Sequence, residues 1–116
     1  MEQITYSDFE KLDIRIGTVT KAEVPEWSHW VMKLEVDFGK EIGTKTVFSG
    51  IMKFYKSEDL ENKQFPFVIN LEPKKIGPEK ELSEAMMIMA VPSEAEDVSP
   101  VLFQLQQKVD NGAKVR

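Results

Sequence analysis

The chain has 116 residues, of which 41% are hydrophobic, 30% charged and 9% aromatic, a composition typical of one globular domain. Its net charge of −5 argues against a protein that coats nucleic acid by bulk positive charge, while a local basic patch stays open. The absence of cysteine excludes disulfides and thiolate metal sites, and the single histidine, His29, excludes a histidine metal cluster.

No segment has the pattern of a signal peptide, and none reaches the ~18 apolar residues of a membrane-spanning helix. The longest apolar run, residues 85–91, has the length of a strand. We therefore expect a cytoplasmic protein without membrane contact. Since no glycine-rich phosphate loop, calcium loop or motif around His29 is found, we expect no enzyme activity and no cofactor.

The first residues predict a short helix. Ser7 and Glu10 have the spacing of a capping box, which opens one helical turn. Phe9 and Leu12 lie three residues apart within this turn and are expected to face the core together.

Three strands follow the helix. Residues 13–24 predict one long strand, in which Gly17 permits a bend or a bulge. In residues 31–38 one face is nearly all apolar and the other mostly charged, which is typical of a half-buried antiparallel strand. Residues 39–43 predict a hairpin connection to a third strand at residues 44–49.

The second half is predicted to hold a short helix, three strands and connecting loops. These are a helix within 51–60, a strand at 65–71, a loop at 72–82, a strand at 86–91, an acidic loop at 92–99, a short strand at 100–105 and a tail with a turn at Asn111-Gly112. Five main strands with a helix between the third and fourth predict an all-β OB-fold, a five-stranded Greek-key barrel with terminal extensions. We expect one domain over residues 1–116, with an SH3-like barrel as the alternative fold.

Several motifs, taken in order, resemble the tRNA-binding OB-fold domain, which occurs free-standing and at the C-terminus of many methionyl-tRNA synthetases. They are DFEKLDIRIG at 8–17, KLEVDFG at 33–39, FSGI at 48–51, NLEPKK at 70–75, SEAM at 83–86 and VDNGAKVR at 109–116. Residues 37–45 and 76–78 also resemble the export-associated chaperone family CsaA. The resemblance covers essentially the whole chain.

The first resemblance implies a non-catalytic homodimer that binds tRNA by shape and backbone contacts, with its terminal segments packed across the dimer interface. Recognition by shape suits folded RNA, which offers backbone and 2′-hydroxyl groups more readily than base edges. The first resemblance also implies an aminoacyl-tRNA synthetase as a partner, which the domain either assists or docks on. The CsaA resemblance implies instead a peptide-binding dimer for unfolded or exported polypeptide.

The candidate tRNA-binding residues are polar, basic or stacking side chains at or near the expected ligand face of the barrel: Lys33, Ser49, Asn70, Lys74, Lys75, Ser83, Met86 and Trp30. Each has a structural alternative: an ion pair for Lys33, backbone capping for Asn70, turn closure for the serines, core packing for Met86 and a solvated loop for the lysine pair.

Two tryptophans are the sharpest local feature. Trp27 and Trp30 follow Pro25 in the loop before the second strand, and Trp30 stands where the family usually has lysine. Indoles there can stack on bases, anchor a peptide or a dimer interface, or cover the end of the barrel. The family pattern also departs at Glu72, where a basic residue is frequent, and at Ala85, where glycine is usual.

Overall fold

The computed structural model describes residues 1–116 and consists mainly of strands. Neither of its two helices has the length and apolar composition needed to span a bilayer. The elements in chain order are α1 (Tyr6–Glu10), β1 (Ile14–Glu23), β2 (Met32–Asp37), β3 (Thr44–Ser49), α2 (Ser57–Leu60), β4 (Gln64–Val68), β5 (Lys74–Ile76), β6 (Glu81–Ser83), β7 (Met86–Met87), β8 (Met89–Ala90), β9 (Val101–Leu102) and β10 (Lys114–Val115).

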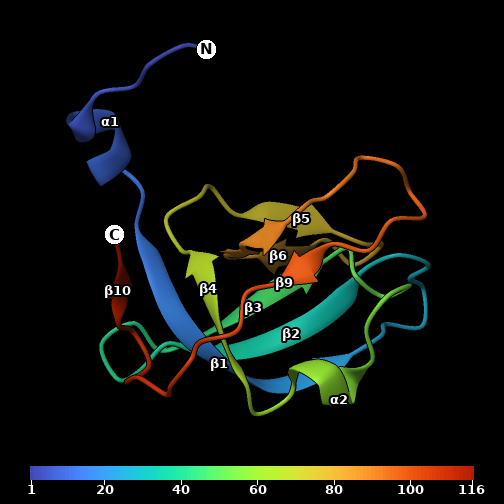
Figure 1. The fold of residues 1–116 in the computed structure, drawn as a ribbon. Coiled ribbons are helices and arrows are strands. Elements are labelled where there is room, and N and C mark those ends of the chain that lie inside the picture. Colours follow the sequence, from blue (N-terminus) through green and yellow to red (C-terminus); the bar gives the residue numbers. More distant parts are fainter.

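The main sheet has the order β3-β2-β1-β4-β7 with every pairing antiparallel, and it curls into a nearly closed barrel (Figure 1). The two ends of the sheet meet where the backbone N–H of Glu84 donates to the carbonyl of Thr46 at 2.8 Å. The helix α2 lies between β3 and β4 in the chain. This arrangement confirms the predicted all-β OB-fold.

The core is the inside of the barrel. The apolar face of β2, including Leu34 and Val36, is completely buried, as its alternating pattern predicts. Phe38 and Phe67 meet edge to face with their ring centroids 5.3 Å apart. From β1, Val19 and Ala22 both belong to this core although they lie three residues apart, so the alternation of the strand is interrupted between them.

The bend in β1 has a different origin from the one expected. The register between β1 and β2 slips between Val19 and Lys21, which makes Thr20 the extra residue of a bulge. Gly17 serves close packing instead, since a Cβ atom there would lie 2.6 Å from the side chain of Val36 and 2.7 Å from the ring of Phe38.

The N-terminal helix is present, but its cap and its orientation differ from the prediction. Thr5, not Ser7, caps α1: its hydroxyl accepts from the N–H of Asp8 at 3.1 Å, and the carboxylate of Asp8 accepts from the N–H of Thr5 at 3.3 Å. The hydrogen bond from the Thr5 backbone N–H to the Asp8 carboxylate, followed by the one from the Lys11 ammonium, lowers the pKa of Asp8. Phe9 and Leu12 do not face the core, because α1 projects from the barrel and leaves both exposed (Figure 1).

Three other segments also differ. Most of residues 72–82, expected as a loop, belong to the hairpin β5–β6, whose turn is closed by the Lys80 N–H donating to the Gly77 carbonyl at 3.1 Å. The strand expected at 86–91 is divided into β7 and β8, which belong to different sheets. The tail forms the turn at Asn111-Gly112 as predicted and then adds β10, which pairs with the start of β1.

Candidate nucleic-acid interface

A groove of about 490 Å³ lies between the loop before β2, the strand β3 and the connections on either side of the β5–β6 hairpin. We call it the Trp30–Met86 groove. Its lining residues are Trp30, Val31, Phe48, Gly50, Leu71, Glu72, Lys74, Ile76, Ser83, Ala85 and Met86. Most are apolar, and Lys74 and Glu72 are the two charged members.

Four of the eight predicted site residues meet in this groove: Trp30, Lys74, Ser83 and Met86. Trp30 and Met86 keep 55% and 56% of their surface exposed, so their apolar faces are open to a ligand. Lys75 is exposed beside Lys74 on β5 but does not line the groove. The structure therefore brings together half of the predicted set.

The exposure of Trp30 follows from a tightly closed turn beneath it. The hydroxyl of the buried Ser28 accepts from the N–H of Val31 at 2.8 Å and from the N–H of Trp30 at 3.3 Å, and donates to the Val31 carbonyl at 2.8 Å. A serine that satisfies these backbone groups fixes the direction of the chain as it enters β2. The indole of Trp30 is thereby left facing outward.

Trp27 has a structural position instead. Its ring lies 6.3 Å from that of Phe48 and meets Trp30 edge to face at 6.4 Å. It also packs against Gly77, where a Cβ atom would lie 2.5 Å from the indole. Of the interpretations open for the tryptophan pair, covering the barrel end fits Trp27, and a ligand-facing position fits Trp30.

Lys33 forms an ion pair and does not line the groove. Its ammonium lies 2.7 Å from the carboxylate of Glu81 on β6, and the hydrogen bond from this pair is the main reason why the pKa of Lys33 is raised. The structural alternative for Lys33 is therefore the one observed, with a partner in the β5–β6 hairpin and not in a neighbouring strand of the main sheet. The pair ties the hairpin to β2.

The predicted amide and hydroxyl groups are also hydrogen-bonded within the chain or buried in it. Asn70 accepts from the N–H of Asp13 at 3.0 Å and donates to the carbonyl of Lys11 at 2.6 Å, which is the backbone capping considered for it. Ser49 is buried on the inner face of β3. Ser83 accepts from the N–H of Phe48 at 3.0 Å, so it closes the barrel as well as lining the groove.

The groove also has apolar residues that the sequence interpretation missed: Phe48, Leu71 and Ile76. The signal for Ile76 was its spacing of two from Lys74, which places both on one side of a strand. The polar composition of residues 72–82, which predicts a loop, hides that signal. An apolar wall beside one free ammonium suits a flat or apolar ligand group that carries a nearby negative charge.

Comparison with known proteins shows the family of the chain. A family model described as "Putative tRNA binding domain" matches residues 14–114. The methionine–tRNA ligase of Clostridium perfringens is 37% identical over 99% of the chain, and that of Pyrococcus horikoshii is 38% identical over 100%. The chain spans only 17% and 15% of the length of these two ligases.

Solved structures of similar size match along their whole length. The chaperone CsaA of Bacillus anthracis is 35% identical with a TM-score of 0.86, covering 99% of this chain and 100% of that one. The MetRS-related protein of Pyrococcus horikoshii is 35% identical with a TM-score of 0.86, covering 100% of both chains. With the family model spanning nearly the whole barrel, the chain belongs to the tRNA-binding domain family.

Proposed function

We propose that this domain binds tRNA, without catalysis, through the Trp30–Met86 groove. The observation that carries the proposal is the convergence of Trp30, Lys74, Ser83 and Met86 in one open groove of a tRNA-binding-family barrel. The indole of Trp30 and the thioether of Met86 offer a stacking surface, while Lys74 and the neighbouring Lys75 supply ammonium groups for phosphate.

Filter binding of labelled total tRNA at several salt concentrations tests this proposal, with a linear RNA hairpin as competitor. We expect saturable binding that weakens with salt and resists the hairpin. Replacing both Lys74 and Lys75 with alanine should lower the log–log salt slope by about 1.4–1.8, since each phosphate contact contributes roughly 0.7–0.9. The matched control is Lys21→Ala with Lys40→Ala, which changes the charge equally away from the groove. Equal slopes for the two double variants would remove the lysine pair from the site.

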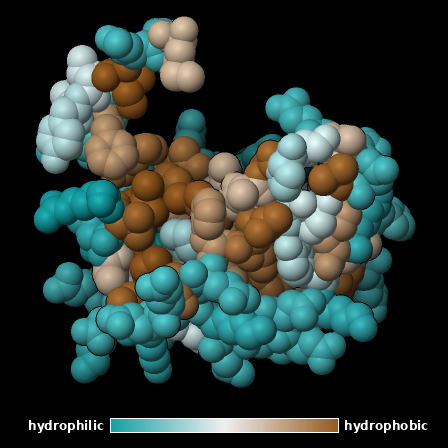
Figure 2. All heavy atoms as spheres, viewed as in Figure 1, coloured by the Kyte–Doolittle hydropathy of each residue, from teal (hydrophilic) through white to brown (hydrophobic).

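The homodimer is part of the same proposal. The helix α1 projects from the barrel, and Tyr6, Phe9 and Leu12 line a shallow hollow together with Val115 near the C-terminus. Figure 2 shows apolar surface continuing from the base of this helix along the adjoining face. A second copy covering these rings would bury them in an isologous interface.

Sedimentation velocity tests the dimer. Phe9→Glu should shift the protein to monomer, because a carboxylate would be buried in the interface, whereas Lys40→Glu on the β2–β3 hairpin should leave the sedimentation coefficient unchanged. A monomeric wild type would refute the dimer and leave the groove proposal standing. A synthetase partner is consistent with the ligase relatives, and co-purification with a methionyl-tRNA synthetase tests it.

A second function, peptide binding of the CsaA kind, is favoured by the apolar lining of the groove and by the loss of Lys33 to its ion pair with Glu81. Titration with an unfolded polypeptide should then change the emission of Trp30, which is half-exposed in the groove. A saturable emission change with no tRNA binding at low salt would replace the primary proposal. A flat response would dismiss this alternative.

A further inference from the structure

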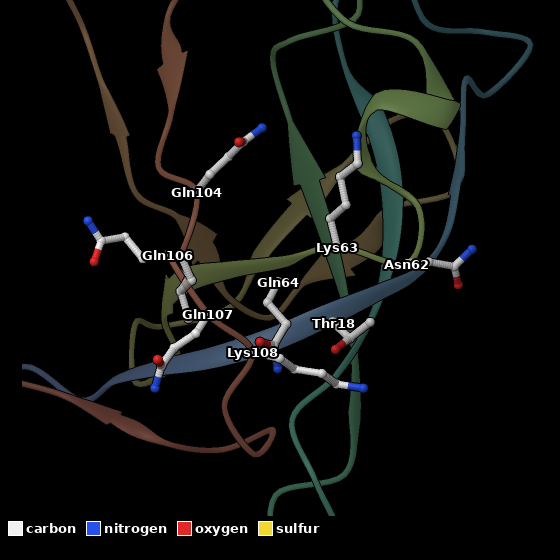
Figure 3. A pocket seen from close by; sticks show the side chains of 9 residues that line it. Thr18, Asn62, Lys63, Gln64, Gln104, Gln106, Gln107 and Lys108 are labelled. Atoms are coloured by element: carbon white, nitrogen blue, oxygen red, sulfur yellow. The ribbon is translucent and has the colours of Figure 1, made fainter.

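A second hollow region lies apart from the Trp30–Met86 groove and shares no residue with it. Two cavities of about 440 and 530 Å³ share the lining residues Lys63 and Gln104, and they therefore adjoin each other. Figure 3 shows the two sides of its polar half: Gln104 and Lys108 come from the segment after β9, and Lys63 comes from the turn after α2. We call this feature the glutamine trough.

Of the eight polar side chains that line the polar half of the trough, Thr18 and Gln64 hydrogen-bond to the tail, and the other six have no partner in the molecule. None of them takes part in a hydrogen bond or an ion pair within the chain, in contrast to Lys33 and Lys45, which both pair with glutamates. These side chains are Asn62, Lys63, Gln104, Gln106, Gln107 and Lys108. Every one of them can donate a hydrogen bond, and two carry a positive charge.

The charge of the trough is opposite to that of the chain. The protein has 20 Asp and Glu residues, yet none of them lines the polar half. The other half contains one carboxylate, Asp59, which accepts a hydrogen bond from the backbone N–H of Lys56 at 2.8 Å. The trough is therefore a local positive region that suits an anionic ligand rich in hydrogen-bond acceptors.

The other half of the trough offers aromatic surface. Phe54 and Tyr55 are its ring residues, and both are partly exposed. The hydroxyl of Tyr55 donates to the carbonyl of Pro100 at 2.5 Å, which holds this ring against the segment that leads into β9. Aromatic rings followed by free donors along one channel are what sequence-tolerant binders of single-stranded nucleic acid use.

We propose that the glutamine trough is a second RNA site, which holds unpaired nucleotides with a base against Phe54 or Tyr55 and the sugar–phosphate chain along Lys63 to Lys108. The proposal rests on the proposed binding of tRNA and adds that an unpaired loop or end of a folded RNA is held separately from the Trp30–Met86 groove. An unfolded polypeptide fits this trough poorly, because six unpaired polar side chains would meet its apolar residues.

The first test is binding of a short single-stranded RNA to the full chain, followed by fluorescence anisotropy across a salt series. Lys63→Ala with Lys108→Ala should lower the log–log salt slope by about 1.4, because each contact to a single strand contributes about 0.7. The matched control, Lys21→Ala with Lys40→Ala, should keep the wild-type slope. Phe54→Leu retains apolar bulk but loses the ring, and should weaken binding at least about fivefold.

The second test locates the strand directly, by photo-crosslinking an oligonucleotide that contains 4-thiouridine and identifying the attached peptides. Attachment within residues 54–63 or 101–108 supports the proposal. Attachment only around Trp30 and Met86, with an unchanged slope in the Lys63 and Lys108 variant, overturns it and leaves tRNA binding by the groove intact. Crosslinking of an unfolded polypeptide in the trough also overturns the proposal of a second RNA site. If no RNA binds at low salt, both this proposal and the proposed function are refuted.

Discussion

Replacing Gly77 with alanine should destabilise the protein through two separable effects. Gly77 has a φ of +78°, a conformation that costs a residue with a Cβ about 1–2 kcal/mol. The new Cβ would also lie 2.5 Å from the ring of Trp27, which packs near Phe48 and Trp30, and such overpacking typically costs about 1–3 kcal/mol. The expected loss in the free energy of unfolding is therefore about 2–5 kcal/mol.

Gly43 provides the matched control. Its φ is +83°, but a Cβ there would meet nothing within 4 Å, so Gly43→Ala carries the conformational cost alone. In urea titrations followed by far-ultraviolet circular dichroism, the midpoint of Gly77→Ala should lie roughly 0.5–1.5 M below that of Gly43→Ala. Adding Trp27→Leu to Gly77→Ala should recover part of the difference, and a double-mutant cycle measures this coupling. Equal midpoints for the two alanine variants, or a cycle without coupling, would refute the reasoning.

Three further predictions concern the barrel and its attachments. Gly17→Ala should lower the free energy of unfolding by about 2–3 kcal/mol in the same assay, because its Cβ would meet the buried ring of Phe38; wild-type stability would contradict the packing described. The raised pKa of Lys33 means that its ion pair with Glu81 stabilises the fold fully below the unfolded-state pKa of 10.5, and that this stabilisation is lost as the pH rises through the higher folded-state pKa. Above about pH 10.5, the free energy of unfolding should therefore fall more in the wild type than in Glu81→Gln. Asn70→Ala should lower the free energy of unfolding by about 1 kcal/mol and speed amide hydrogen exchange at the junction of α1 and β1. Unchanged exchange would show that the two hydrogen bonds of the Asn70 side chain are not needed at this junction.

The barrel was predictable because its strands carry a pattern that burial imposes. Alternation in β2 fixes which face is buried, and glycines with positive φ at positions 39 and 43 fix the hairpin that follows it. The β5–β6 hairpin was not predictable in the same way, because its residues are largely exposed and its stability comes from Trp27 and from the ion pair of Lys33. The exposure of Phe9 was not predictable for a related reason, since the sequence does not distinguish an apolar residue that packs inside the barrel from one that stays on its surface.

The candidate site was predictable in part. Lys74 and Met86 follow from the family motifs, and the structure places both in the groove. Asn70 and Lys33 belong to the same motifs, but their side chains are taken up by backbone groups and by Glu81. Whether a polar residue is free or already paired depends on contacts between distant segments, and spacing along the chain does not reveal them.

The two contacts that hold the β5–β6 hairpin, between Trp27 and Gly77 and between Lys33 and Glu81, join segments that are far apart in the sequence. Closing such long loops is entropically costly, so the hairpin is expected to dock late in folding, after the central strands have paired. A newly synthesised or partly refolded chain would then lack the groove, and a ligand of the groove would bind only fully folded molecules. A bound ligand would in turn hold the hairpin in place and shift the balance away from partly opened forms.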